Sequence, residues 1–176
     1  THCESSAASD VYKRQIVGFA GLKASLMAVN AGKTVLIANK ESIVAAGDIL
    51  MPLARSKGSI IIPIDSEHNA IFQCLPEDKT TKDVDKITIT ASGGPFINIP
   101  LSKLSDISPK DALKHPNWEM GSKVSIDSAT LVNKCLELIE ARYLFDLNEK
   151  FFDLVVHPQS IVHSIVTYKD GSSISQ

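Results

Sequence analysis

Two carboxylates lie two positions apart at the point where a buried strand is expected to end. Asp65 and Glu67 follow the β-branched, apolar run from Ser59 to Ile64. Residues two apart in an extended chain face the same side, so both carboxylates can be presented to one point. Adjacent carboxylates repel unless a proton or cation lies between them, and oxygen ligands favour Mg²⁺ or Mn²⁺. The pattern indicates a metal site, although on spacing alone helix capping by Asp65 is the more common explanation.

A glycine pair follows another expected strand, in Ala91-Ser92-Gly93-Gly94-Pro95-Phe96. Paired glycines let backbone N–H groups approach an anion, and the Ser92 hydroxyl adds a further hydrogen bond. The segment is neither a Walker nor a Rossmann fingerprint, because the downstream lysine or third glycine is missing. A plain turn is the more common alternative.

A third group of polar residues surrounds an expected long helix within 125–145. We expect a strand end near Ser125, a helix cap at Asp127 or Ser128, and a polar helix face of Thr130, Asn133, Lys134 and Glu137, spaced i, i+3, i+4 and i+7. A lysine, an amide and a hydroxyl near a helix start suit a phosphate group. Glu137 is then a third candidate carboxylate. The core face of this helix is expected to consist of Val132, Leu136, Ile139 and Tyr143. For the polar face, the alternative is a solvated surface with a Lys–Glu pair.

The single tryptophan lies in an expected loop, His115-Pro116-Asn117-Trp118-Glu119-Met120-Gly121. An exposed tryptophan can cover a ligand and exclude water, whereas a buried one anchors its loop to the core. We assign no function to His157 or His163.

The elements that must position these residues alternate between helix and strand. We expect a helix over 16–30, a strand over 34–38, a helix over 42–55 kinked by Pro52, and a strand over 59–64. Such β-α-β alternation predicts a parallel, doubly wound sheet. After Asp65 we expect a short helix (70–75), strands (86–91 and 151–156), a small helix capped by Ser108, and a hairpin (161–168 and 172–176) turning at Asp170-Gly171. The predicted fold is α/β, a remnant of a Rossmann-like sheet (16–64) followed by an α+β catalytic domain (65–176).

Composition excludes several classes of protein. The net charge of −2 and the lack of a basic block argue against nucleic acid as a partner, and no apolar run is long enough to cross a membrane. The three cysteines are far apart, which fits a reducing compartment better than a disulfide framework. Residues 1–15 have no apolar period, and we interpret them as a non-native head, with a disordered tail as the alternative. The sequence stops inside an expected strand, so we expect a C-terminal part to be missing.

In order, these segments resemble 1-deoxy-D-xylulose 5-phosphate reductoisomerases. The resemblance extends over 16–176 and rests on Asn39-Lys40-Glu41-Ser42, Asp65-Ser66-Glu67-His68-Asn69, Ala91-Ser92-Gly93-Gly94-Pro95-Phe96, His115-Pro116-Asn117-Trp118 with Met120-Gly121, Ile126-Asp127-Ser128-Ala129-Thr130 with Asn133-Lys134, and His157-Pro158-Gln159-Ser160. Each motif alone is modest, but six in order make a chance match very improbable.

The resemblance implies a set of site residues. It implies Mg²⁺ or Mn²⁺ bound by Asp65, Glu67 and Glu137, and substrate phosphate bound by Ser92, Ser128, Asn133 and Lys134. Contacts to the sugar are implied for Ser66, Lys40 and His115, and contacts to NADPH for Asn39, Glu41 and Gly121; Lys40, Glu67 and His115 would be catalytic. Trp118 would lie on the loop that closes over the substrate.

The resemblance also implies an activity, an oligomeric state and a cellular compartment, and the sequence departs from the family at several places. The activity is metal-dependent, NADPH-linked rearrangement and reduction of 1-deoxy-D-xylulose 5-phosphate to 2-C-methyl-D-erythritol 4-phosphate, in a homodimer of the bacterial cytoplasm or a plastid. This sequence lacks the family's glycine-rich nucleotide loop and its C-terminal helical part, and has Cys135 where the family usually has glycine. Two alternatives stay open: an inert fragment that binds only metal and phosphate, and an aldolase or isomerase that needs no nicotinamide. The second is disfavoured by Asn39-Lys40-Glu41, which resembles the cofactor side of the family.

Overall fold

Two small sheets and the helices between them make up the chain. The structure is a computed structural model that describes residues 11–14, 18–113 and 122–176. In chain order the first half contains β1 (Val11–Arg14), the 3₁₀ helix η1 (Phe19–Gly21), α1 (Leu22–Asn30), β2 (Thr34–Ile37), α2 (Lys40–Lys57) and β3 (Ile61–Pro63). The second half contains α3 (Ser66–Cys74), β4 (Val84–Ala91), η2 (Leu101–Asp106), α4 (Pro109–Ala112), α5 (Ser122–Ala129), α6 (Val132–Phe145), η3 (Glu149–Phe151), β5 (Phe152–Val156), β6 (Ser164–Tyr168) and β7 (Ser173–Ser175).

The first sheet is parallel, in the order β1-β2-β3. The apolar run of β2 is paired on both sides, as the sequence predicts for a buried parallel strand. Val11–Arg14 belong to the stretch we interpret as a non-native or disordered head. These four residues form a strand here, and the interpretation of residues 1–15 as a non-native or disordered head stays a prediction.

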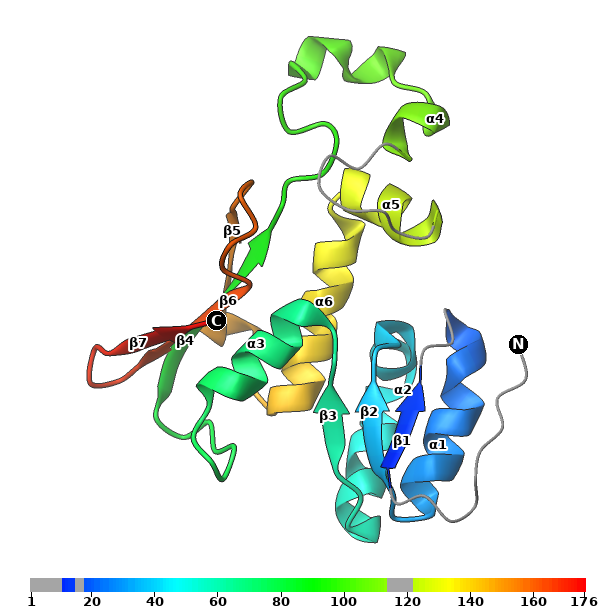
Figure 1. The fold of residues 1–176 in the computed structure, drawn as a ribbon, viewed down its shortest axis with the longest axis vertical. Coiled ribbons are helices and arrows are strands. Elements are labelled where there is room, and N and C mark those ends of the chain that lie inside the picture. Colours follow the sequence, from blue (N-terminus) through cyan, green and yellow to red (C-terminus); the bar gives the residue numbers. More distant parts are fainter. Residues whose placement is uncertain (1–10, 15–17, 114–121) are drawn as a thin grey trace.

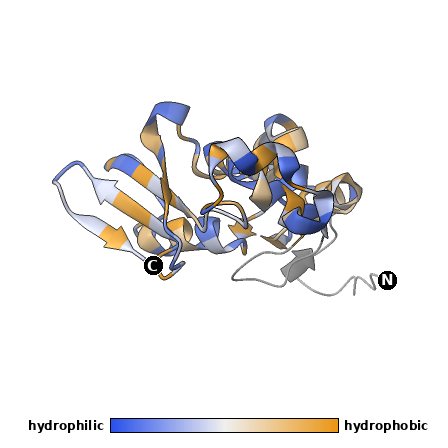
Figure 2. Ribbon diagram, turned by 90° about the horizontal axis from the view of Figure 1, so that it is seen from above, coloured by the Kyte–Doolittle hydropathy of each residue, from blue (hydrophilic) through white to orange (hydrophobic). Residues whose placement is uncertain are grey.

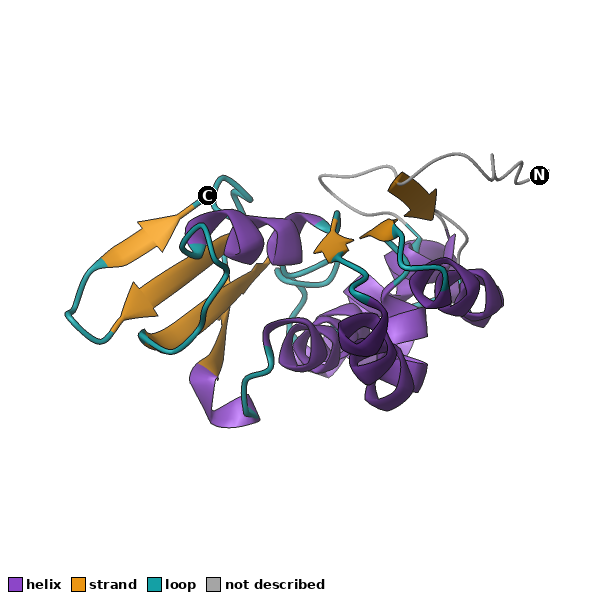
Figure 3. Ribbon diagram, turned by 90° about the horizontal axis from the view of Figure 1, so that it is seen from below, coloured by secondary structure: helices purple, strands orange, loops and turns teal. Residues whose placement is uncertain are grey.

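The second sheet is mixed, in the order β5-β4-β6-β7. β4 is parallel to β5 and antiparallel to β6, and β6 and β7 form the expected hairpin. Gly171 turns the hairpin with a φ of 87°, a conformation in which a Cβ would be strained. Figure 3 shows this sheet on one side of the molecule and most helices gathered on the other. The α/β fold class predicted from the sequence is confirmed.

Helix α6 lies between the two halves and packs against both (Figure 1). One core cluster, around Ile71, Ile87, Ile89 and Val166, includes Ala141 and Phe145 of α6. The other, in the first half, is joined by Tyr143 and Leu144 of the same helix. Apolar bands alternate with polar ones along the strands of the second sheet in Figure 2, as half-buried strands require.

The structure corrects several local predictions around α5 and α6. Ser125 lies inside a helix and not at a strand end, and Asp127 and Ser128 lie inside α5 and cap no helix start. The break between the helices is at Leu131, which has a φ of 60°. The predicted core face of α6 is wrong for Val132, which is 46% exposed, and for Ile139, which is 42% exposed, whereas Tyr143 packs against the core of the first half. The helix buries instead a face made of Lys134, Glu137, Glu140, Ala141 and Phe145.

Helix α2 is longer than predicted, and its irregularity lies elsewhere. Its non-helical residue is Ala46, with φ −145° and ψ 26°, six positions before Pro52. The helix begins at Asn39, whose side chain accepts a hydrogen bond from the backbone N–H of Ser42 at 3.0 Å. It ends at Gly58 in the left-handed conformation. The helix thus begins directly after β2, which places Lys40 at the carboxyl end of the parallel sheet.

Candidate metal and phosphate site

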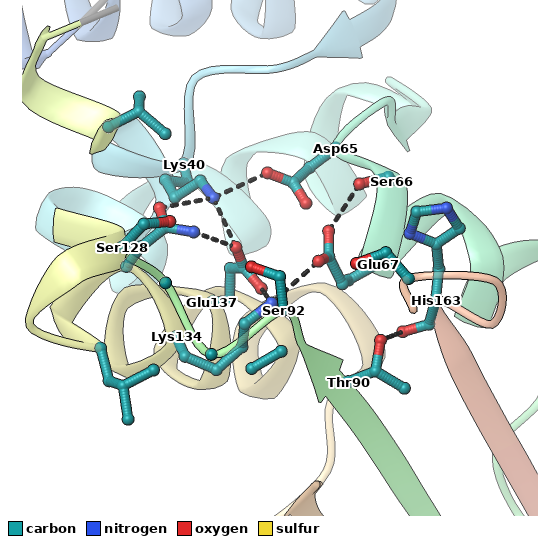
Figure 4. Close-up of a pocket in the computed structure, with 17 residues that line it drawn as sticks. Lys40, Asp65, Ser66, Glu67, Thr90, Ser92, Ser128, Lys134, Glu137 and His163 are labelled. Carbon is teal, nitrogen blue, oxygen red and sulfur yellow. Dashed lines mark hydrogen bonds and ion pairs between the residues drawn. The ribbon is translucent and has the colours of Figure 1, made fainter. Parts of the chain in front are cut away.

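The candidate carboxylates converge on a pocket of about 320 Å³. Asp65 and Glu67 come from the start of α3, where the positive end of the helix dipole favours carboxylates. Glu137 comes from the buried face of α6. One oxygen from each lies within 4.8 Å of the others. Figure 4 shows the three side chains pointing toward one another from these two elements.

Two lysines lie among these carboxylates. The Nζ of Lys40 is 2.7 Å from Asp65 and 2.9 Å from Glu137. The Nζ of Lys134 is 2.8 Å from Glu67 and 2.6 Å from Glu137. Lys40 also donates to the amide oxygen of Asn133 at 3.1 Å, and Asn133 in turn donates to Glu137. Every charged group of the cluster is therefore paired, as burial of ionised side chains requires.

Burial and the neighbouring charges shift the pKa values of this cluster in opposite directions. Burial alone would lower the pKa of each lysine, but the adjacent carboxylates outweigh it and raise both above the ordinary value. Burial would raise the pKa of Asp65, but His68 and Lys40 hold it well below its usual range. Burial, and then the charges of Asp65 and Glu67, raise the pKa of Glu137. A further cation beside Glu137 would favour its ionised form.

The chemistry of this donor set fits a hard divalent cation. Three carboxylates supply only oxygen ligands, which suit Mg²⁺ and Mn²⁺ and not a thiolate-preferring metal. The Oδ1 atom of Asp65 is buried and accepts no hydrogen bond from the described residues. Asp65, Glu67 and Glu137 are the residues that would hold the ion.

The other side of the pocket is lined by small polar groups. Ser92, Gly93 and Gly94 follow β4, and Ser128 approaches from α5. Gly94 has a φ of 68°, and a Cβ there would lie 2.6 Å from the backbone oxygen of Ser128. Glycine at this position lets the turn and α5 approach closely enough to face one cavity. The turn is therefore more than a connection, because it forms one wall of the pocket.

Most of the residues singled out from the sequence are brought together here. Those that line the pocket are Lys40, Asp65, Ser66, Glu67, Ser92, Ser128, Asn133, Lys134 and Glu137. Thr130, grouped with the polar face of the helix, lies before α6 and does not line it. His115, Trp118 and Gly121 lie outside the described residues. Cys135 is exposed, on a face of α6 away from the buried lysine and glutamate.

The two described residues on the proposed cofactor side make local contacts. The amide of Asn39 caps α2 and donates to the backbone oxygen of Gly18 at 2.8 Å. Glu41 lies 3.0 Å from the Nζ of Lys123. Contact of either residue with NADPH stays a prediction.

Sequence reasoning missed two kinds of residue. Thr90, Ser160 and His163 line the pocket, although His163 was assigned no function. His68 and Glu140 lie directly behind Asp65 and are fully buried. His68 lies inside the motif Asp65-Ser66-Glu67-His68-Asn69, from which its function could have been suspected. Glu140 has no sequence signal beyond its position three residues after Glu137.

The described geometry defines a class of protein, namely α/β proteins with a carboxylate–lysine pocket at the carboxyl ends of strands. Such a pocket suits a divalent cation and an anion. Residues 61–145 match the family described as the 1-deoxy-D-xylulose 5-phosphate reductoisomerase C-terminal domain, and residues 2–47 match the 1-deoxy-D-xylulose 5-phosphate reductoisomerase family. The second range reaches into the stretch interpreted as a non-native head, whose origin stays a prediction. The chain belongs to the 1-deoxy-D-xylulose 5-phosphate reductoisomerase family.

Curated relatives and solved structures agree with this assignment. The chain is 54% identical over 177 residues to a 1-deoxy-D-xylulose 5-phosphate reductoisomerase of Acinetobacter baylyi, covering 96% of the chain and 44% of the relative. A relative in Ruthia magnifica is 54% identical over 168 residues, covering 96% and 43%. A solved reductoisomerase in complex with NADPH, fosmidomycin and magnesium has a TM-score of 0.92 at 50% identity, covering 97% and 44%. The enzyme from Zymomonas mobilis in complex with NADPH has a TM-score of 0.89 at 48% identity, covering 97% and 43%. The chain thus spans less than half the length of these relatives.

Proposed function

We propose that this chain forms the metal- and phosphate-binding part of an enzyme that converts 1-deoxy-D-xylulose 5-phosphate to 2-C-methyl-D-erythritol 4-phosphate with NADPH. The observation that carries the proposal is the convergence of three carboxylates, two lysines and four serines on one pocket. The solved relatives that hold magnesium and NADPH support the same assignment. We propose that the whole protein is a homodimer of the bacterial cytoplasm or of a plastid. No helix among the described residues is long and apolar enough to cross a membrane.

The charges of the pocket support a metal-dependent order of binding. Three carboxylates and two ammonium groups sum to −3 + 2 = −1. A bound divalent cation changes this sum to −1 + 2 = +1. The pocket would then repel a phosphate group before the metal binds and attract it afterwards. We therefore propose that phosphate binds the metal-loaded chain much more tightly than the metal-free chain.

The chain's own residues would bind the phosphate group, orient the sugar and exclude water from the site. Lys134, Asn133, Ser92 and Ser128 would hold the phosphate group, which fixes the sugar against the carboxylates. Lys40 and Ser66 lie beside the metal-binding carboxylates and would contact the oxygens of the sugar. A bound metal supplies Lewis-acid polarisation of the substrate carbonyl. NADPH supplies the hydride. We propose that His115 contacts the sugar, that Asn39, Glu41 and Gly121 contact NADPH, and that Trp118 covers the site.

The first test is a calorimetric titration of Mn²⁺ into the chain and into its Glu137→Gln variant. Loss of one charged ligand should weaken binding by about 1–3 kcal/mol. The matched control is Glu77→Gln, because Glu77 is exposed and lies outside the pocket. Equal affinities of the chain and Glu137→Gln would contradict the ligand assignment.

A second test separates catalysis from binding. NADPH consumption that depends on 1-deoxy-D-xylulose 5-phosphate would mean that the 176-residue chain itself turns over. Binding of Mn²⁺ and phosphate without such consumption would favour the narrower function, a binding fragment of the enzyme.

A further inference from the structure

A buried pair of ionisable side chains lies behind the candidate metal ligands. His68 on α3 and Glu140 on α6 are each 0% exposed, and neither lines the pocket. The first is one residue beyond Glu67, and the second is one helical turn beyond Glu137. The pair therefore lies where the two ligand-bearing helices meet.

The imidazole of His68 contacts both of these helices. Its Nε2 is 2.8 Å from the backbone oxygen of Glu137. A carbonyl oxygen only accepts, so Nε2 carries the hydrogen of this bond. The other ring nitrogen, Nδ1, is 3.2 Å from Oε2 of Glu140 and 3.6 Å from Oδ1 of Asp65. One ring thus hydrogen-bonds to the backbone of one candidate ligand and lies at ion-pair distance from the side chain of another.

Apolar packing does not account for Glu140. The Oε1 and Oε2 atoms of its carboxylate are buried without a hydrogen-bond partner among the described residues, apart from the ion-pair distance to His68. Replacing a buried ion pair by apolar side chains of similar volume is often neutral or stabilising, so such a pair is weak evidence for stability. Its position behind Asp65 points to a function in the site.

We propose that Glu140, acting through the ring of His68, is a positioning residue that orients Asp65 and the Glu137 segment for metal binding. The inference rests on the proposed function, because it needs Asp65 and Glu137 to be ligands. Side chains behind a metal site commonly fix the orientation of its ligands, and their loss typically weakens metal affinity by about 10- to 100-fold. In this proposal Glu140 is not itself a ligand, although Asp65, His68 and Glu140 also place one ligand atom each within 4.8 Å of one another.

The test is a double-mutant cycle followed by Mn²⁺ calorimetry. The four chains are the unmodified chain, Glu140→Gln, His68→Gln and the double variant. Glu140→Gln should bind one Mn²⁺ about 10- to 100-fold more weakly. In the His68→Gln background the same change should alter affinity by less than about threefold, because the connecting ring is already gone. Glu77→Gln serves as the exposed control.

The possible outcomes separate this inference from the proposed function. An unchanged affinity in Glu140→Gln, or an equal loss in both backgrounds, would overturn the positioning role. A stoichiometry of two Mn²⁺ ions per unmodified chain and one per Glu140→Gln chain would overturn it too, because Glu140 would then be a ligand of a second ion. No binding by the unmodified chain would overturn the proposed function, and the inference with it.

Near-UV circular dichroism checks that each variant is folded. If Glu140→Gln alone does not fold, the double variant replaces the ion pair by a neutral amide pair and is compared with His68→Gln. A loss of Mn²⁺ affinity between these two chains would then overturn the inference, and equal affinities would support it.

Discussion

Substitution of Gly47 by alanine should destabilise the chain, although the same change usually stabilises a helix. Gly47 lies within α2, where it faces the ring of Tyr143 on α6. A Cβ at this position would lie 2.4, 2.5 and 2.7 Å from three ring carbons. Ordinary contact begins near 3.4 Å, so the helices must separate or the ring must move by about 1 Å (3.4 − 2.4).

Two opposing contributions set the size of the effect. Alanine is favoured over glycine inside a helix by about 1 kcal/mol. Overpacking of a well-packed contact costs typically about 1–3 kcal/mol. The clash involves the fixed end of the ring and not a flexible tip, so its cost should lie in the upper part of that range, at about 2–3 kcal/mol. After subtraction of the helix contribution, we expect Gly47→Ala to lower the free energy of unfolding by about 1–2 kcal/mol.

Urea unfolding measures this change, and Mn²⁺ titration measures its consequence for the site. Lys40 begins the helix that carries Gly47, and its contact to Glu137 should lengthen if the helices separate. Mn²⁺ affinity should therefore change together with stability. The double variant Gly47→Ala/Tyr143→Ala removes the obstructing ring and should show a coupling that restores part of the stability. A Gly47→Ala chain as stable as the unmodified one would refute the argument.

Three further predictions concern the pocket and its surroundings. Gly94→Ala should destabilise by about 1–3 kcal/mol and weaken phosphate binding to the Mn²⁺-loaded chain, because it combines a positive φ with a clash against Ser128; unchanged phosphate affinity in calorimetry would contradict this. Burial opposes the charge of His68, but neighbouring carboxylates raise its pKa to about 9, so its contribution to stability is complete below pH 6.5 and lost as the pH rises through 9. Urea unfolding should show a loss on the order of 3 kcal/mol across that range, flatter in His68→Gln, and a rise in stability would count against it. His157→Ala should speed amide exchange at Ile161, whose N–H donates to the His157 ring at 3.1 Å; unchanged exchange would show that the ring does not hold this loop.

Local signals explain what the sequence predicted correctly. The β2-α2-β3 unit was predicted from short apolar runs and helical spacing, which act over a few positions. The caps at Asn39 and Gly58, which set the longer bounds of α2, were not part of that prediction. Asp65 and Glu67 do face one pocket, but the extended-chain spacing from which this was predicted is wrong, because Asp65 lies at the start of α3 and Glu67 in its first turn. Their meeting with Glu137 is a contact between residues far apart in sequence, and it was expected only through the family resemblance.

The errors occur where tertiary contacts override the local pattern. Periodicity placed Val132 and Ile139 in the core, because apolar residues at helical spacing usually face inward. The structure buries Lys134 and Glu137 instead, since that face forms the pocket and the opposite charges pair there. Departures of this kind are expected at functional sites. The helical state of Ser125 was missed because Val124 and Ile126 alternate with Ser125 and Asp127, which is a strand-like period.

The position of Lys40 has a consequence for the coupling between the two halves of the chain. Among the described lining residues, it is the one that comes from the first half, and it is shared between Asp65 and Glu137. Any ligand that shifts α2 relative to α6 also changes the electrostatic energy of the carboxylate cluster. By thermodynamic reciprocity, a metal bound at the cluster must alter the affinity for that ligand by the same factor. A single ammonium group thus couples the position of α2 to the electrostatic energy of the carboxylate cluster.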